Sequence, residues 1–206
     1  MFWNYIWGFV VVVLLASGMF GAVSWNVNVW LIGAVVVIWL VSMYNGLVSM
    51  RSRVREALSD IDVQLKRRFD LIPNLLEAVK GYMAHEKGVL EQVTEARAKV
   101  AAGGTPVERA GAEAALTGTI TKLFAVAENY PDLKANTNFL SLQEELTDTE
   151  NKIQAARRFY NSMVMGMNAA VASFPTNVLA GTFGFVEEKY FELKSGTERE
   201  PVQVKF

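Results

Sequence analysis

The first 50 residues of the chain contain no charged side chain, and no other feature of the sequence constrains the fold as strongly. Every Lys, Arg, Asp and Glu lies at Arg51 or beyond. Residues 6–23 and 27–43 form two mostly apolar runs of 18 and 17 residues. At about 1.5 Å per helical residue, each run is just long enough to cross a hydrocarbon layer of about 30 Å. The pattern predicts two membrane-spanning helices that form a hairpin over residues 1–43.

Residues typical of a membrane interface separate and flank the two apolar runs. Ser24, Asn26 and Asn28 are polar enough to turn the chain between two spans. Aromatic residues that anchor helices at the headgroup level lie near the expected interfaces: Trp3, Tyr5, Trp7, Trp25, Trp30 and Tyr44. A cleaved signal peptide is an alternative interpretation of the first run, although that run lacks a preceding basic segment.

Basic residues follow the second apolar run closely: Arg51, Arg53, Arg55, Lys66, Arg67 and Arg68. Such an excess normally stays on the cytoplasmic side of a membrane. We therefore expect a multi-pass protein of the cell membrane whose soluble part is cytoplasmic. The two runs contain no Asp, Glu, Lys, Arg or His, which argues against an ion pathway built on such groups.

The remainder of the chain, residues 51–206, has the composition of one soluble domain. It holds 20 basic and 21 acidic side chains, and the net charge of −1 provides no field that would attract nucleic acid. Cysteine is absent, which excludes disulfides, thiolate metal sites and cysteine nucleophiles.

Apolar residues recur at every third or fourth position after residue 47, which is the spacing of an amphipathic helix. The first such pattern, in which Arg68 falls on the apolar seam, consists of Leu47, Met50, Val54, Leu58, Ile61, Leu65, Ile72, Leu75 and Val79. This helix is expected to begin inside the membrane and to continue to about Val100, where glycines and a proline end it. Gly81 and Gly88 weaken it locally.

Two further helices are predicted, over residues 107–130 before Pro131 and over residues 139–174 before Pro175. The third keeps an unbroken heptad spacing through Phe139, Leu142, Leu146, Thr149, Ile153, Ala156, Tyr160, Met163, Met167, Ala170 and Phe174. Asn136, Thr137 and Asn138 precede it as natural N-caps. Beyond it, Gly181 and Gly184 permit a turn, while Phe183 and Phe185 require burial.

Pro73 lies inside the first helical pattern. A proline removes one backbone donor and clashes with the carbonyl four residues earlier, which belongs to Phe69. We expect Asp70 to help cap a restarted helical segment, so that the helix bends there. A functional hinge is the alternative.

The charged residues of the soluble part are interpreted as structural. Arg67 and Arg68 are expected to form ion pairs with acidic residues of a neighbouring helix, such as Glu144 or Glu145, rather than a binding site. A solvated helix face is the interpretation of the acidic cluster Glu144, Glu145, Asp148 and Glu150, with a metal site as the alternative.

His85 is the only histidine, and its neighbours do not support catalysis. A zincin needs a second histidine four residues later, where this chain has Val89, and a di-metal carboxylate helix needs Glu and His three apart, whereas residue 82 is Tyr. A phosphoacceptor histidine would need a glycine-rich nucleotide domain, which the sequence does not contain. We expect a structural His85, solvent-facing or hydrogen-bonded, and predict no catalytic, cofactor-binding or metal-binding residue.

Three stretches carry a family resemblance: YNGLVSMRSRVREALSDIDVQLKRRFDLIPNLLEAVKGYMAHE, ENYPDLKANTNFLSLQEELTDTENKIQAARRFYN and SFPTNVLAGTFGFVEEKYFE. Together they resemble the LemA family over roughly residues 44–192. The resemblance implies a bacterial, membrane-anchored domain of long antiparallel helices without established enzymatic activity. Family members usually show one N-terminal span, so the second apolar run departs from the pattern.

The predicted architecture is all-α: a transmembrane helical hairpin over residues 1–43, an antiparallel bundle of long helices over residues 44–192 and a flexible tail over residues 193–206. The predicted function is that of a non-enzymatic, membrane-anchored scaffold that self-associates or organises other envelope proteins. Its expected partners are the lipid bilayer, copies of itself and a membrane or envelope protein, without nucleic acid or a cofactor. Alternatives are an accessory subunit that recruits an enzyme to the membrane and an oligomeric small transporter or channel.

Overall fold

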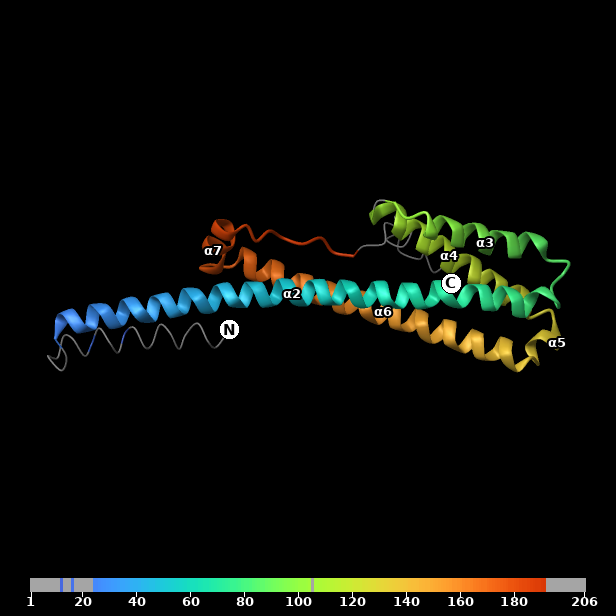
Figure 1. Cartoon of the computed structure of the whole chain (residues 1–206), viewed down its shortest axis with the longest axis horizontal. Helices are drawn as coiled ribbons and strands as arrows, with labels where there is room; N and C mark the ends of the chain where they lie inside the picture. Colours follow the sequence, from blue (N-terminus) through green and yellow to red (C-terminus); the bar gives the residue numbers. More distant parts are fainter. Residues whose placement is uncertain (1–11, 13–15, 17–23, 105, 192–206) are drawn as a thin grey trace, which may run out of the picture. The chain divides into compact units, whose positions relative to one another are not determined.

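The computed structural model describes Val12, Ala16, residues 24–104 and residues 106–191, and within them it contains helices and no strand (Figure 1). The helices that lie wholly within residues 24–191 are α2 (Trp25–Lys80), α3 (Lys87–Ala101), α4 (Pro106–Ala127), α5 (Pro131–Lys134), α6 (Thr137–Ala172) and α7 (Thr176–Phe183). The all-α prediction is confirmed. The predicted first span lies almost entirely outside the described residues, as does the predicted tail.

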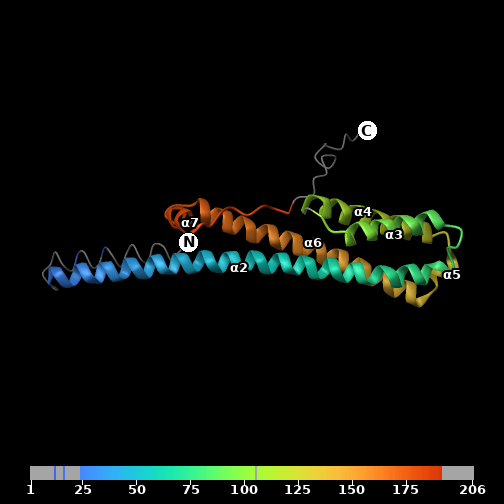
Figure 2. The same cartoon turned by 45° about the horizontal axis from the view of Figure 1, so that its top comes forward.

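Helix α2 runs without interruption for 56 residues, from the second apolar run into the charged part of the chain (Figure 2). It is the one helix of the described part that is by itself long and apolar enough to cross a membrane. Only 6% of its most apolar window is buried, and Trp30 is 80% exposed. One helix thus contains the second apolar run and continues beyond it into the charged part of the chain. Asn26 and Asn28 lie inside this helix rather than in a turn.

The first helix does not continue to Val100, as the apolar spacing predicted. It ends at Lys80, and a short connection precedes α3, in which the amides of Tyr82 and Met83 both donate to the carbonyl of Val79. Met83 is completely buried, so the connection is fixed to the core. The break has a physical reason: a straight helix would carry the apolar residues of α3 away from those of α2, whereas the break lets both sets share one core. The end of α3 at Ala101, before the glycine pair, agrees with the prediction.

Pro73 lies inside α2, and the helix does not restart there. Asp70 accepts a hydrogen bond from the Lys66 ammonium group on the exposed surface, so the predicted capping role of Asp70 is wrong. The carbonyl that the proline leaves without its helical donor belongs to Phe69, and Arg97 of α3 donates to it across a long 3.5 Å contact. The same guanidinium lies 4.1 Å from the centroid of the Phe69 ring. The proline thereby exposes an acceptor that a neighbouring helix uses.

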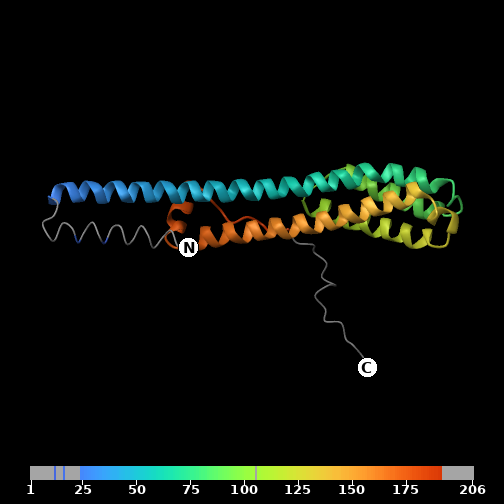
Figure 3. The same ribbon diagram turned by 90° about the horizontal axis from the view of Figure 1, so that it is seen from below.

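The chain divides into two compact units, one of residues 1–55 with 162–189 and one of residues 56–161 with 190–206. The second unit contains the principal core. Its buried members come from α2, α3, α4, α5, α6 and the α2–α3 connection: Ile72, Leu75, Val79, Met83, Val89, Val93, Ala96, Leu116, Ile120, Leu123, Ala127, Leu133, Phe139 and Leu146. Helices α3 and α4 lie side by side in all three views (Figure 3). The boundaries predicted at residues 43 and 192 stay a prediction.

Two details of the second and third helices follow from local chemistry. Helix α4 ends at Ala127, and Pro131 begins the short helix α5, where its missing N–H leaves no helical acceptor unpaired. The Asn136 side chain accepts hydrogen bonds from the amides of Asn138 and Phe139 at 3.0 and 3.1 Å, so the predicted N-cap of α6 is confirmed at this residue.

The heptad seam of α6 is buried along most of its length, with Leu146 and Ile153 at 3% and 0% exposure. It fails at its end, because Phe174 is 82% exposed. The reason is that α6 ends at Ala172 and the chain bends by 98° into α7, which carries Phe174 away from the seam.

The structure also differs from the prediction on α2 and around Gly181. On α2, Met50 and Leu58 are exposed although the spacing placed them on the seam, and Ala57 is buried instead. The segment expected to turn at Gly181 is helix α7, which ends at Gly184 with a left-handed φ of 68°. Phe185 is buried as predicted, whereas the predicted burial of Phe183 is wrong, because its side chain is 54% exposed.

Candidate functional site: a buried arginine that joins three helices

The most polar feature of the core in the second unit is Arg68, which is 2% exposed. It occupies a position on the buried face of α2, between the apolar Leu65 and Ile72, so the helical repeat itself directs its side chain inward. A guanidinium group stays charged at any physiological pH and its burial is costly unless opposite charges and acceptors surround it.

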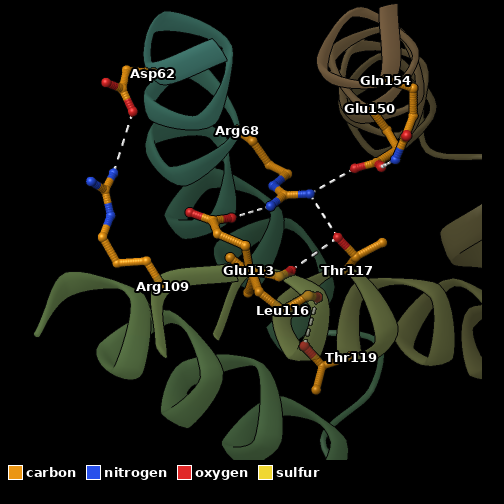
Figure 4. Close-up of polar contacts among 9 residues, drawn as sticks. All are labelled: Asp62, Arg68, Arg109, Glu113, Leu116, Thr117, Thr119, Glu150 and Gln154. Atoms are coloured by element: carbon orange, nitrogen blue, oxygen red, sulfur yellow. Dashed lines mark hydrogen bonds and ion pairs between the residues drawn. The ribbon is translucent and has the colours of Figure 1, made fainter. Parts of the chain in front are cut away.

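The neighbouring helices supply those partners (Figure 4). The guanidinium group of Arg68 donates to the carboxylate of Glu113 and to the hydroxyl of Thr117, both on α4, the latter at 2.7 Å. It also donates to the carboxylate of Glu150 on α6 at 2.6 Å. A single side chain of α2 is thus tied to two other helices.

The partners of Arg68 are held in turn by their own helices. The Thr117 hydroxyl donates to the carbonyl of Glu113 at 3.1 Å, one helical turn earlier. The amide of Gln154 donates to the second carboxylate oxygen of Glu150 at 2.9 Å. The Thr117 hydroxyl and the Glu150 carboxylate are therefore oriented by their own helices, which reduces the entropy lost when Arg68 binds them.

Another arginine, Arg157 on α6, lies close enough to influence this cluster electrostatically. Partial burial lowers the pKa of its guanidinium group, whereas the negative charge of Glu150 raises it. The guanidinium carbon of Arg157 lies 4.9 Å from the centroid of the Phe191 ring. The backbone of Phe191 is fixed by Asn161, which accepts from its amide at 2.8 Å and donates to its carbonyl at 3.2 Å.

A pocket of about 170 Å³ adjoins the cluster, with room for a few water molecules. Its lining combines the polar cluster with apolar residues of α4 and α6: Arg68, Thr117, Ile120, Thr121, Phe124, Leu146, Thr147, Glu150 and Asn151. Two carboxylates already compensate the charge of Arg68, so the pocket offers no excess positive charge to an anion. The geometry is that of a structural clamp, in which charge and hydrogen bonds select one pairing of helices.

The predicted ion pairs of the two arginines are confirmed in kind but not in their partners. Arg67 lies 4.0 Å from Asp148, and both side chains are about half exposed. Glu144 and Glu145 are exposed and make neither pair. The proposed acidic cluster is therefore divided, because Glu150 turns inward to Arg68.

Glu113 is the residue that the sequence interpretation missed. Its signal was present: it lies three and seven residues before Leu116 and Ile120, on the buried face of α4, where a lone carboxylate requires a cation. His85 is exposed, as one of the two predicted environments requires. Among the residues that the structure describes, no group of three or more His, Asp or Glu side chains is arranged to hold a metal ion.

The comparison with known families decides the affiliation of the chain. The sequence pattern of the LemA family matches residues 57–206, which is most of the chain. The chain belongs to the LemA family. The match includes the four residues that we call the Arg68 clamp: Arg68, Glu113, Thr117 and Glu150.

Individual relatives of this LemA family member agree with the assignment. It is 29% identical over 140 residues to protein LemA of Metamycoplasma hominis, a match covering 66% of this chain and 63% of that protein. It is 25% identical over 181 residues to magnetosome protein MamQ 1 of Paramagnetospirillum magneticum, covering 75% of this chain and 66% of the relative. The chain therefore spans just under two thirds of the length of these relatives. None of their names describes an enzyme.

The clamp generates a stability prediction. Replacing Arg68→Met leaves the carboxylate of Glu113 buried without its cation, so we expect the free energy of unfolding to fall by about 3–5 kcal/mol. Urea unfolding of the full chain in mild detergent, followed by circular dichroism, measures the change.

The adjacent residue is the matched control, because Arg67 is half exposed and its ion pair is long. The variant Arg67→Met should lose no more than about 1 kcal/mol. In the double variant Arg68→Met, Glu113→Leu, no buried charge is left at this contact, and part of the loss should be recovered. Equal small effects of Arg67→Met and Arg68→Met would show that the cluster does not hold the helices together.

Proposed function

We propose that this LemA family protein is a non-enzymatic, membrane-anchored helical scaffold that self-associates and organises other envelope proteins. The observation that carries the proposal is the continuity of α2, whose first part is uncharged and exposed and whose second part belongs to the core. Such a helix connects a membrane segment to a folded domain through a single secondary-structure element. The magnetosome relatives, which are named for a cellular structure rather than for a reaction, support a structural role.

Self-association through the membrane segment is supported by the surface of α2. Large apolar side chains project from it, including Trp30 at 80% exposure and Val37 at 59%. Gly33 lies on the same helix, and a Cβ atom added there would meet nothing within 4 Å. A small residue on an open helix surface allows a second helix to approach closely, which is how membrane helices gain packing energy.

The finer topology is part of the proposal. Residues 6–23 and 27–43 form two spans, the arginines from Arg51 onward hold the soluble part in the cytoplasm, and the long helices of that part form an antiparallel bundle. The support is the uncharged sequence before Arg51 and the short connections between successive helices of the core.

Gly33→Leu tests the self-association. The substitution fills the open helix surface without a clash inside one copy, so we expect association to weaken about tenfold, which corresponds to about 1.4 kcal/mol. Energy transfer between donor- and acceptor-labelled copies in lipid vesicles measures it, with the label on a cysteine introduced at the exposed Glu91. Ala34→Leu, on a different side of the same helix, is the control and should leave transfer unchanged. Unchanged transfer in both variants would contradict self-association through the Gly33 surface.

Single cysteines at Ser24 and at Glu91 test the topology, since the chain has no cysteine of its own. A membrane-impermeant thiol reagent added to intact cells should modify the cysteine at residue 24 and not the one at residue 91. Both should react after the membrane is permeabilised. Modification at residue 91 in intact cells would place the soluble part outside the cytoplasm.

A further inference from the structure

A second uncharged stretch lies far from the first in the sequence. Residues 159–186 contain no Lys, Arg, Asp, Glu or His, and the stretch is bounded by Arg158 and Glu187. It comprises the end of α6, the bend and α7. Helices α6 and α7 together are apolar enough for a span, yet the bend of 98° between them prevents a single straight crossing.

The first unit exposes large apolar side chains of this stretch. Phe174 is 82% exposed, Val178 62%, Phe183 54% and Val186 68%. These fractions match those along the apolar part of α2, where Val37 is 59% exposed. Several large apolar side chains exposed to this extent indicate an interaction surface, because removing apolar surface from water lowers the free energy.

Contacts within the first unit fix the place of α7 along α2. The Tyr44 ring lies 4.9 Å from that of Phe183 and 5.9 Å from that of Phe185, both edge-on. The guanidinium carbon of Arg51 lies 4.7 Å from the Phe185 centroid. Tyr44 directly follows the apolar run and Arg51 is the first charged residue, so α7 is attached where α2 leaves its uncharged segment. In a membrane protein this is the level of the headgroups.

The far end of the stretch is also fixed. The Asn168 side chain of α6 accepts from the amide of Glu188 at 2.8 Å and donates to its carbonyl at 2.9 Å. These two hydrogen bonds attach the segment after α7 to α6, at the point where the uncharged stretch is followed by Glu187 and Glu188. Residues 169–186 therefore form an uncharged projection that is closed at its base, rather than a free tail.

We propose that α7 lies in the headgroup layer of the same membrane that α2 crosses, as a second contact of the chain with the lipid bilayer. Continuity of the apolar surface from α2 to α7, through Tyr44, identifies lipid as the occupant. The bend supports this orientation: within the first unit the end of α6 runs roughly along the first part of α2 (Figure 3), so a helix turned from α6 by 98° lies roughly in the membrane plane. The inference rests on the proposed membrane crossing of α2.

Depth-dependent fluorescence quenching tests the proposal in the full chain. Environment-sensitive dyes are attached to single cysteines at Val178 on α7, at Val37 on α2 and at Leu140 on α6, all exposed apolar positions. Each protein is reconstituted into vesicles of phosphatidylcholine and phosphatidylglycerol that carry spin-labelled lipids, with the spin label placed either near the headgroup or deep in the acyl chain. Leu140 is the matched control, because charged residues surround it in the sequence.

The proposal predicts that the shallow quencher acts most strongly on the dye at residue 178 and the deep quencher on the dye at residue 37, with little effect of either at residue 140. Quenching at residue 37 alone would overturn the placement of α7 and leave the membrane crossing intact. A dye at residue 178 that is shielded from water but not quenched by lipid, and that becomes exposed on dilution with lipid, would assign the surface to a second copy and overturn the proposal. Absence of quenching at residue 37 would overturn the membrane crossing and this inference together.

Discussion

The continuity of helix α2 is the constraint on which the rest of the structure depends. In a hydrocarbon layer every backbone polar group must be paired within the chain, so an apolar segment there is held as a helix. Helix α2 does not end with its apolar segment but continues through Arg51 to Lys80. The residues of its second part therefore continue the helical repeat of the uncharged segment. Ile72, Leu75 and Val79 lie at helical spacing on its second part and contribute the α2 side of the core.

Two sites on α2, at Arg68 and at the Phe69 carbonyl, form polar contacts with the neighbouring helices. Arg68 reaches α4 and α6 through Glu113, Thr117 and Glu150. Five residues later, Pro73 leaves the carbonyl of Phe69 open to Arg97 of α3. The Arg68 cluster is not an efficient source of stability, because burial of charge costs about as much as the ion pair returns. Its effect is to penalise wrong pairings of helices, in which Arg68 or Glu113 would be buried without a partner.

Much of the fold could be predicted from the sequence, because it depends on one-dimensional signals. The uncharged start, the heptad of α6 and the Asn136 cap are local patterns, and each identifies a helix or its end. The break after Lys80 could not be found in this way: the apolar spacing continues across it, and only the shared core of α2 and α3 explains it. The same holds for Phe174, whose position on a heptad says nothing about the bend that follows Ala172.

The partners of Arg68 and the exposure of α7 could be predicted from the sequence only in part. A lone arginine on an apolar seam requires a buried acid, and Glu113 was recognisable by its spacing from Leu116 on the same helix face. The choice between Glu150 and Glu145 was not recognisable, since both lie on α6 and only the packing of three helices brings one of them inward. The uncharged stretch around α7 is visible in the sequence. Its exposure is not, because the apolar heptad pattern suggests a buried helix.

Hydrogen exchange of the backbone amides of residues 44–56, measured on the full chain in lipid vesicles, tests the continuity of α2 most directly. An uninterrupted helix predicts that these amides exchange as slowly as those of the flanking residues 36–43 and 57–64, because each is bonded to the carbonyl four residues earlier. Rapid exchange confined to residues 44–56, with protection on both sides, would show a flexible linker between membrane segment and core. That result would contradict a single uninterrupted helix from the uncharged segment into the core.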